Sequence, residues 1–225
     1  DKIKIHHPTL NEIADYGEQE YYGLVSRLTC VPSDYKVQLF DMGVDYEEIS
    51  EFDMFALMCN GLEAEETCIL FGDLNFAGLK LMQHNNTGEM MLYNYEQDFV
   101  IDRCVYEIIV EYLRKIHGFE KNIEMAGNKY TKQILIDEAR NLQEQNKNKS
   151  YKSMLIPLIS ALTNTADFKY SHSTVWDLPI YVFMDSVKRI QKIKNYNYLM
   201  QGAYSGNVDT KKISKDELNW LGELK

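Results

Sequence analysis

The residues best suited to chemistry form one acidic stretch, from Asp41 to Asp53, which carries six carboxylates. Carboxylates this close together raise the question of a calcium loop. The stretch lacks the alternating D-x-[DN]-x-[DN]-G order of such loops, and no Glu stands where the bidentate ligand is required. The start of a helix explains the stretch better, because the positive end of the helix dipole favours carboxylates.

Histidine and cysteine provide no second candidate for a chemical site. His6 and His7 are adjacent, so a strand would point them to opposite faces. The four cysteines have irregular spacings among apolar neighbours and predict buried free thiols; they are Cys30, Cys59, Cys68 and Cys104. The sequence contains no phosphate loop, dinucleotide turn, zinc helix or nucleophile elbow. We therefore expect no catalytic residue, no cofactor and no metal, and a protein that is not an enzyme.

The composition fits one or two globular domains, with 225 residues of which 45% are hydrophobic and 26% charged. The net charge of -10 disfavours nucleic-acid binding. Residues 1–100 hold 5 Lys and Arg against 19 Asp and Glu, whereas residues 101–225 hold 19 against 15. This asymmetry fits head-to-tail contacts or steering of a charged partner, or simply an acidic solubilising surface. Since no apolar run reaches the length of a membrane span and the start lacks a signal peptide's apolar core, we expect a soluble, intracellular protein.

The first region, residues 1–117, has the pattern of short helices followed by a hairpin. Ser50 and Asp53 have capping-box spacing, and the helix after them ends at Gly61. The inward stripe of that helix comprises Phe52, Phe55, Ala56 and Cys59. Earlier helices are expected after the Thr9–Glu12 capping pair, from Glu18 to Leu28, and from Pro32 to near Gly43. Apolar runs on either side of an N-N-T-G turn predict a two-stranded hairpin near residues 79–93.

A strong helical pattern then covers residues 101–116. Its predicted inward residues are Ile101, Cys104, Val105, Ile108, Tyr112 and Ile116. The second region, residues 130–225, is mildly basic and predicts four helices, at 130–144, at 153–162, from the capping residue Asp177 to about Met200, and at 214–221. Loops are expected at 118–129 and 143–149. The fold class is therefore mainly α: compact helical domains with a small hairpin, either as these two regions or as one continuous domain.

Two groups of side chains are candidates for partner binding. Met54, Leu57 and Met58 lie off the inward stripe of their helix, so that helix is either central in the core or offers a second face to a partner. The chain has sixteen tyrosines, a residue type enriched at interfaces. The candidates near the end of the long helix are Tyr196, Tyr198 and Tyr204. Half-buried core tyrosine is the competing interpretation for this second group, and we expect Trp176 to pack in the core.

Two stretches resemble small proteins encoded in the tail modules of phages and prophages of Firmicutes. One runs from the H-P-T-L-N-E-I segment to D-M-F near residue 55, and the other from F-K-Y-S-H near residue 168 to the last residues. The second is similar to tail assembly chaperones, in which a W-x-[LM]-P segment opens a helix with an F-[LM]-[DE] element. Here these are Trp176 to Pro179 and Phe183 to Asp185. Residues 72–128 do not match the likeness, and no frameshifted longer partner is visible.

The resemblance implies a mostly helical, non-enzymatic protein in the cytoplasm of the bacterial host. Tail assembly chaperones hold the tape measure protein soluble until the tail tube polymerises around it. The expected partner is therefore the tape measure or another tail protein, and a homo-oligomer is also compatible with the sequence. The alternatives are a structural virion component, in the tail or connector, and a host-directed interaction or regulatory protein.

Overall fold

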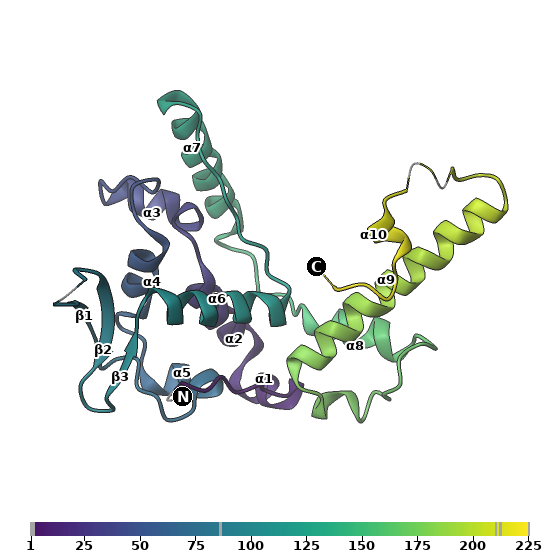
Figure 1. Cartoon of the computed structure of the whole chain (residues 1–225), viewed down its shortest axis with the longest axis horizontal. Helices are drawn as coiled ribbons and strands as arrows, with labels where there is room; N and C mark the ends of the chain where they lie inside the picture. Colours follow the sequence, from purple (N-terminus) through teal and green to yellow (C-terminus); the bar gives the residue numbers. More distant parts are fainter. Residues whose placement is uncertain (1–2, 86, 210, 212, 225) are drawn as a thin grey trace. The chain divides into compact units, whose positions relative to one another are not determined.

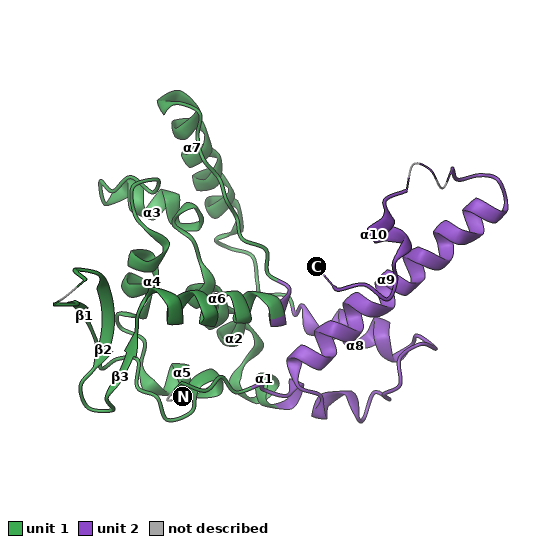
Figure 2. Cartoon of the chain, in the orientation of Figure 1, with its two compact units in different colours: residues 1–6, 12–115, 119–152 green, residues 7–11, 116–118, 153–225 purple. Residues whose placement is uncertain are grey.

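The computed structural model describes residues 3–85, 87–209, 211 and 213–224. Contacts between segments divide the chain into two compact units (Figure 2). Unit 1 comprises residues 1–6, 12–115 and 119–152, and unit 2 comprises residues 7–11, 116–118 and 153–225. The sequence suggested a division between residues 117 and 130, whereas residues 130–152 lie with unit 1. The mainly α fold is confirmed.

The first five α-helices of unit 1 are short, whereas α6 and α7 are longer (Figure 1). They are α1 Leu10–Tyr16, whose first two residues belong to unit 2, α2 Glu18–Thr29, the 3-10 turn η1 Pro32–Tyr35, α3 Lys36–Asp41, α4 Glu51–Cys59, α5 Ala64–Phe71, α6 Arg103–His117, whose last two residues belong to unit 2, and α7 Lys129–Asn146. The predicted cap of α4 is confirmed, since the Ser50 side chain accepts a hydrogen bond from the Asp53 backbone N–H. Helix α5 was not predicted, although Glu66 reaches back to the Glu63 backbone N–H in the manner of a capping box.

The small sheet has three antiparallel strands in the order β1-β2-β3: β1 Leu79–Gln83, β2 Met90–Asn94 and β3 Phe99–Ile101. The predicted hairpin is β1 and β2, with Leu81 opposite Leu92. Buried Asn94 orders the turn that follows, because its side-chain oxygen accepts hydrogen bonds from the backbone N–H groups of Glu96 and Gln97. Strand β3 corrects the sequence analysis, which had placed Ile101 at the start of a helix.

The inward face of α6 also differs from the prediction. Cys104 and Ile108 are exposed, and Ile108 is 68% accessible. Ile116 is buried as predicted, and the other buried residues of this helix are Tyr106, Ile109, Val110, Leu113 and His117. The predicted stripe and the observed stripe both have helical spacing. The Asp102 side chain accepts a hydrogen bond from the Val105 N–H and so caps the helix after Ile101, which lies in β3 and is not part of the helical stripe. Pattern alone could not choose between them.

The core of unit 1 forms around α4 and α6. The predicted stripe of α4 is confirmed, since Phe52, Phe55, Ala56 and Cys59 are all buried. The Phe52 and Phe55 rings lie with centroids 5.6 and 4.9 Å from that of Tyr106. All four cysteines were predicted to be buried. The prediction is confirmed for Cys30 and Cys59, which are buried free thiols, and wrong for Cys68 and Cys104, which are exposed.

Unit 2 is built on one long helix. Its elements are α8 Leu155–Thr163, the 3-10 turn η2 Val175–Asp177, α9 Ile180–Tyr204 and α10 Lys215–Leu218. Residues 7–11 join it through the Leu10 N–H to Leu178 C=O and Ile180 N–H to Pro8 C=O hydrogen bonds. The cap predicted at Asp177 is wrong, because Asp177 ends η2 and Pro179 is the capping residue of α9.

Candidate functional site

A groove in unit 1 lies between the chain that follows α3 and the first half of α7. It encloses about 470 Å³, within the size range of ligand pockets. The apolar part of its lining comprises Phe40, Val44, Tyr46 and Ile136. Phe40 and Val44 are 46% and 39% exposed, and Met42 beside them is 67% exposed. An open apolar surface therefore continues from the groove onto the end of α3.

The local sequence explains the first wall. Helix α3 ends at Asp41 with Met42 as its C-cap, and Gly43 takes a φ of 74°, a value that residues with a Cβ rarely adopt. The chain reverses there, and Asp45 fixes the next turn by accepting a hydrogen bond of 3.0 Å from the Glu47 N–H. The opposite wall begins where Asn128 caps α7 by accepting a hydrogen bond from the Thr131 N–H at 2.9 Å.

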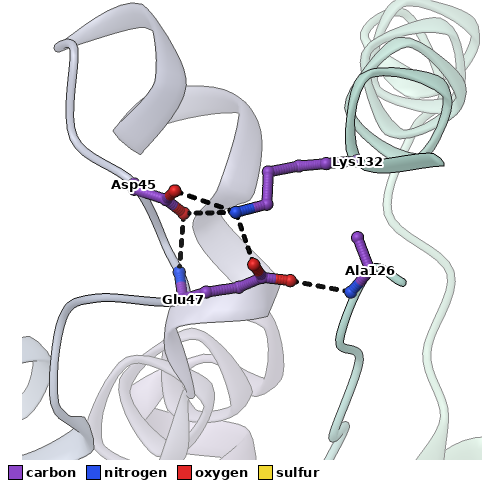
Figure 3. Close-up of polar contacts among 4 residues, drawn as sticks. All are labelled: Asp45, Glu47, Ala126 and Lys132. Carbon is purple, nitrogen blue, oxygen red and sulfur yellow. Dashed lines mark hydrogen bonds and ion pairs between the residues drawn. The ribbon is translucent and has the colours of Figure 1, made fainter. Parts of the chain in front are cut away.

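Lys132 joins the two walls, as Figure 3 shows. Its ammonium nitrogen lies 2.8 Å from both carboxylate oxygens of Asp45 and also pairs with Glu47. The second oxygen of Glu47 accepts a hydrogen bond of 2.7 Å from the Ala126 N–H. The same ammonium lies 5.2 Å from the centroid of the Tyr46 ring, a cation–π distance. One lysine therefore ties α7 to the acidic segment through three side chains.

This arrangement shifts three pKa values in a consistent direction. The hydrogen bond from Lys132, followed by one from a backbone N–H, lowers the pKa of Asp45 and that of Glu47. The two carboxylates raise the pKa of Lys132. At neutral pH all three groups are therefore charged and paired. The carboxylates are therefore poorly suited to donate protons.

A segment of unit 1 without regular structure, residues 119–128, runs along the acidic surface and is fastened at several points. The Ser33 hydroxyl donates a hydrogen bond of 2.7 Å to the Asn122 carbonyl oxygen. The ion pairs of the segment are Lys121 with Glu51 and Glu124 with Lys36. We call residues 119–128 the strap. The strap is a loop, as predicted, and its hydrogen bond and ion pairs hold it against the rest of unit 1.

The acidic stretch differs in role from the prediction of a solvated helix start. Glu51 and Asp53 do lie in the first turn of α4. Asp41, however, receives two hydrogen bonds from Arg140, at 2.5 and 3.2 Å. Together with the Lys132 pairs, this contact shows that the acidic segment is the docking surface for α7. The charge asymmetry between the two parts of the sequence is thus used inside unit 1.

The first group of predicted partner-binding residues lies mostly beneath this surface. Met54 is fully buried in a cluster formed by Cys30, Val37, Leu39, Tyr46, Met54 and Ile136, and Met58 packs against it. Leu57 is 43% exposed and does not line the groove. Of the three, only Leu57 therefore offers a substantial exposed surface, because the other two support the floor on which α3 and α7 pack.

The second group lies in unit 2, near the end of α9. Tyr198 and Tyr204 are 66% and 85% exposed, and Tyr196 is half-buried. The structure describes the two groups in separate units, and neither group lies in the groove. The sequence analysis missed Phe40, Val44 and Lys132. Asp41 and Asp45, four residues apart, and Lys132 and Arg140, about two helical turns apart on α7, carry the complementary charges, but the sequence does not show that they meet.

Neither a metal-binding group nor a membrane-spanning helix is found among the described residues. Within residues 3–85, 87–209, 211 and 213–224, no group of three or more His, Cys, Asp or Glu is placed to hold a metal ion. Across the same residues, no helix combines the length and the apolar character needed to cross a membrane.

Comparison with known proteins identifies one similarity. Residues 144–225 match the family model described as the YomV second domain, a family of phage and prophage type. The match contains all of residues 153–225, the main part of unit 2. No curated protein and no solved structure gives a significant match. The last third of the chain is therefore similar to a phage-associated domain, and the likeness is consistent with a phage protein.

Proposed function

We propose that this chain is a non-enzymatic phage or prophage protein that binds a helical segment of another protein in the groove of unit 1. The observation that carries the proposal is the exposed apolar surface of Phe40, Met42 and Val44, which leads into a groove of about 470 Å³. Exposed apolar surface beside a formed groove is typical of a protein-binding site. The phage-type similarity of residues 144–225 gives the biological setting.

The groove is formed before any partner arrives, and this favours binding. Lys132 and Arg140 hold α7 against the acidic segment, and the buried cluster around Met54 supports the floor. A partner therefore does not need to order the walls, so less of the interaction free energy is lost on association. Apolar residues one helical turn apart on a partner helix could enter such a groove together.

The charge of unit 1 indicates which helix would fit. Residues 153–225 carry nine Lys and Arg against seven Asp and Glu, so most of the net charge of -10 lies in unit 1. A partner helix with an apolar stripe and basic flanks would be attracted to it, with charge mainly affecting the rate of encounter. We propose the tape measure protein as the partner, with this chain as its tail assembly chaperone, because a long helical chain presents such stripes repeatedly.

Co-expression with the tape measure protein tests this function. We expect the tape measure to stay soluble with the wild-type chain and to precipitate with Val44→Asp, which places a charge in the apolar wall. Val100→Asp is the matched control, because Val100 is 37% exposed, close to the 39% of Val44, and lies on β3 outside the groove. Circular dichroism should show that both variants fold.

Two results would count against the proposal. If the tape measure is equally soluble without this chain and no complex survives size exclusion, the chaperone role fails, and a virion component becomes the better explanation. If Val44→Asp retains the complex as well as Val100→Asp does, another surface of the protein is responsible for binding.

A further inference from the structure

The long helix of unit 2 has little buried surface of its own. Within α9, only Ile180 and Phe183 are buried among the described residues. From Lys188 onward the side chains of the helix are half-buried or exposed. The charge along this helix is also one-sided, with four basic residues, Lys188, Arg189, Lys192 and Lys194, against the single acid Asp185. The side chains of this basic helix from Lys188 onward are therefore at least partly accessible to a partner.

Part of this surface is covered by an irregular segment of the same chain. After α10, residues 219–224 run back along α9 (Figure 1). Arg189 donates hydrogen bonds to the Trp220 and Gly222 carbonyl oxygens, at 2.6 and 3.0 Å. Lys192 donates one to the Glu223 carbonyl oxygen, at 2.9 Å. We call residues 214–224 the tail segment, and the part that follows α10 is held through main-chain oxygens.

The tail segment fits α9 incompletely. A cavity of about 510 Å³ that is open to solvent lies between them, with Lys188, Lys192, Tyr198 and Leu199 on the α9 side. Trp220 and Leu221, the largest apolar side chains of the segment, are 39% and 72% exposed. Because this cavity is open, another peptide could make contacts with its lining that the tail segment does not make.

We propose that this face of α9 is a binding site for an acidic, leucine-bearing peptide of a partner protein, and that the tail segment occupies it until the partner arrives. The tail segment itself shows the chemistry that fits, because Asp216, Glu217 and Glu223 face a basic helix and Leu224 lines the cavity. Arginine and lysine donors to main-chain oxygens do not depend on the side chains of the peptide. A partner peptide can therefore make the same hydrogen bonds and add apolar contacts in the cavity.

The binding face of α9 shares no lining residue with the groove of unit 1. It is a second surface, with the opposite charge preference. A protein with both surfaces could hold a basic helix through unit 1 and an acidic peptide through unit 2. The tail segment would regulate the second site, because a competing peptide must first displace it and therefore binds with a lower apparent affinity.

The test uses a fluorescein-labelled peptide with the sequence of residues 214–225 as the probe. Polarisation is measured with the full chain and with a chain ending at residue 213. We expect the shortened chain to bind the probe at least about tenfold more tightly, because its site is vacant. In the shortened chain Arg189→Ala should remove most of this binding. Lys194→Ala is the matched control, since Lys194 is also on α9 but contacts Thr165 and not the tail segment.

A full-chain variant guards against a shortened chain that fails to fold. A Cβ added at Gly222 would lie 3.1 Å from the Asn219 carbonyl oxygen, closer than nearly all observed contacts of this kind. Gly222→Val should therefore loosen the tail segment and leave the α9 surface intact. We expect this variant to bind the wild-type probe more tightly than the unmodified full chain does.

Three results would overturn the proposal. The probe could fail to bind both the shortened chain and Gly222→Val, or bind equally well after Arg189→Ala. The full chain could also form a dimer that depends on residues 214–225, in which case the surface serves a second copy. Val44→Asp should leave probe binding unchanged, so failure here is distinguishable from failure of the proposed groove.

Discussion

Unit 1 and unit 2 are both helical, but they bury their helices to different extents. In unit 1 the helix α6 buries side chains along most of its length, from Tyr106 to Leu113. In unit 2 the 25-residue helix α9 buries only Ile180 and Phe183 among the described residues. In unit 1 the strap is fastened with ion pairs, whereas unit 2 holds its tail segment through main-chain carbonyl oxygens.

This difference in burial affects how each unit can bind a partner. A groove needs fixed walls, and the walls of the unit 1 groove stand on a buried cluster with Lys132 between them. The surface of α9 is covered by the tail segment, whose Trp220 and Leu221 side chains remain exposed. We therefore expect unit 1 to present a formed site and unit 2 to present one that an exchange of peptides must open.

Truncating a core phenylalanine in each unit should give the largest effect on stability. Phe55 and Phe183 are both almost completely buried, at 1% and 0% exposure. Phe55→Ala should cost near the upper end of the range of about 3–5 kcal/mol for such truncations, because its close-packed neighbours cannot relax. Phe183→Ala should cost near the lower end, because the thinner core of unit 2 can collapse into the space. Urea denaturation of both variants measures the difference, and a larger cost in unit 2 would reverse the comparison.

Trp176→Ala should have a smaller effect within unit 2. The sequence suggested a core residue, but the Trp176 side chain is half-buried and its ring lies edge-on to His172 at 6.4 Å. A partly exposed aromatic loses less on truncation, so we expect about 1–2 kcal/mol. Urea denaturation beside Phe183→Ala is the measurement. An equal cost for the two variants would mean that Trp176 belongs to the core after all.

Removing the charge of Lys132 should loosen unit 1. In Lys132→Met, Asp45 and Glu47 lose their common counter-ion, so the urea midpoint should fall by roughly a few tenths of a molar. Lys129→Met is the control, because Lys129 also lines the groove from α7 and is exposed. If both variants unfold at the same urea concentration, the ion pairs of Lys132 contribute nothing to the walls.

The stability of unit 1 should depend on pH through the same groups. Asp45 and Glu47 have pKa values below their usual 3.8 and 4.5, so their contribution is complete above those values and is lost as pH falls through the lowered ones. The pKa of Lys132 is raised above 10.5, so its contribution is complete below that value and is lost only at still higher pH. Denaturation between pH 3 and 6 should show a weaker pH dependence in Lys132→Met than in the wild type. Identical curves would contradict the assignment.

Tyr204→Ala should have the smallest effect on stability. Its side chain is 85% exposed, so the free energy of unfolding should change by less than about 0.5 kcal/mol. If the sequence-based hypothesis of a partner-binding tyrosine is correct, the variant should nevertheless lose part of its retention on a tail-protein column. A clear loss of stability would instead place Tyr204 in packing contacts.

Local signals in the sequence predicted the elements better than their partners. The Ser50 cap, the stripe of α4 and the hairpin are short-range features and were recovered. The inward face of α6 was wrong because two helical stripes competed and β3 took Ile101 from the helix. The groove depends on contacts between residues that are far apart in the chain, such as Asp45 with Lys132 and Asp41 with Arg140. Nothing at either position in the sequence reveals its partner.

Hydrogen exchange of the full chain, read by mass spectrometry, tests the contrast between the units most directly. We expect the amides of α4, α6 and the first half of α7 to exchange only on global unfolding of unit 1. The amides of the second half of α9 and of α10 should exchange at least about a hundredfold faster, through local opening. Equal protection of α6 and the second half of α9 would contradict the account, because the tail segment would then be as firmly held as the walls of the groove.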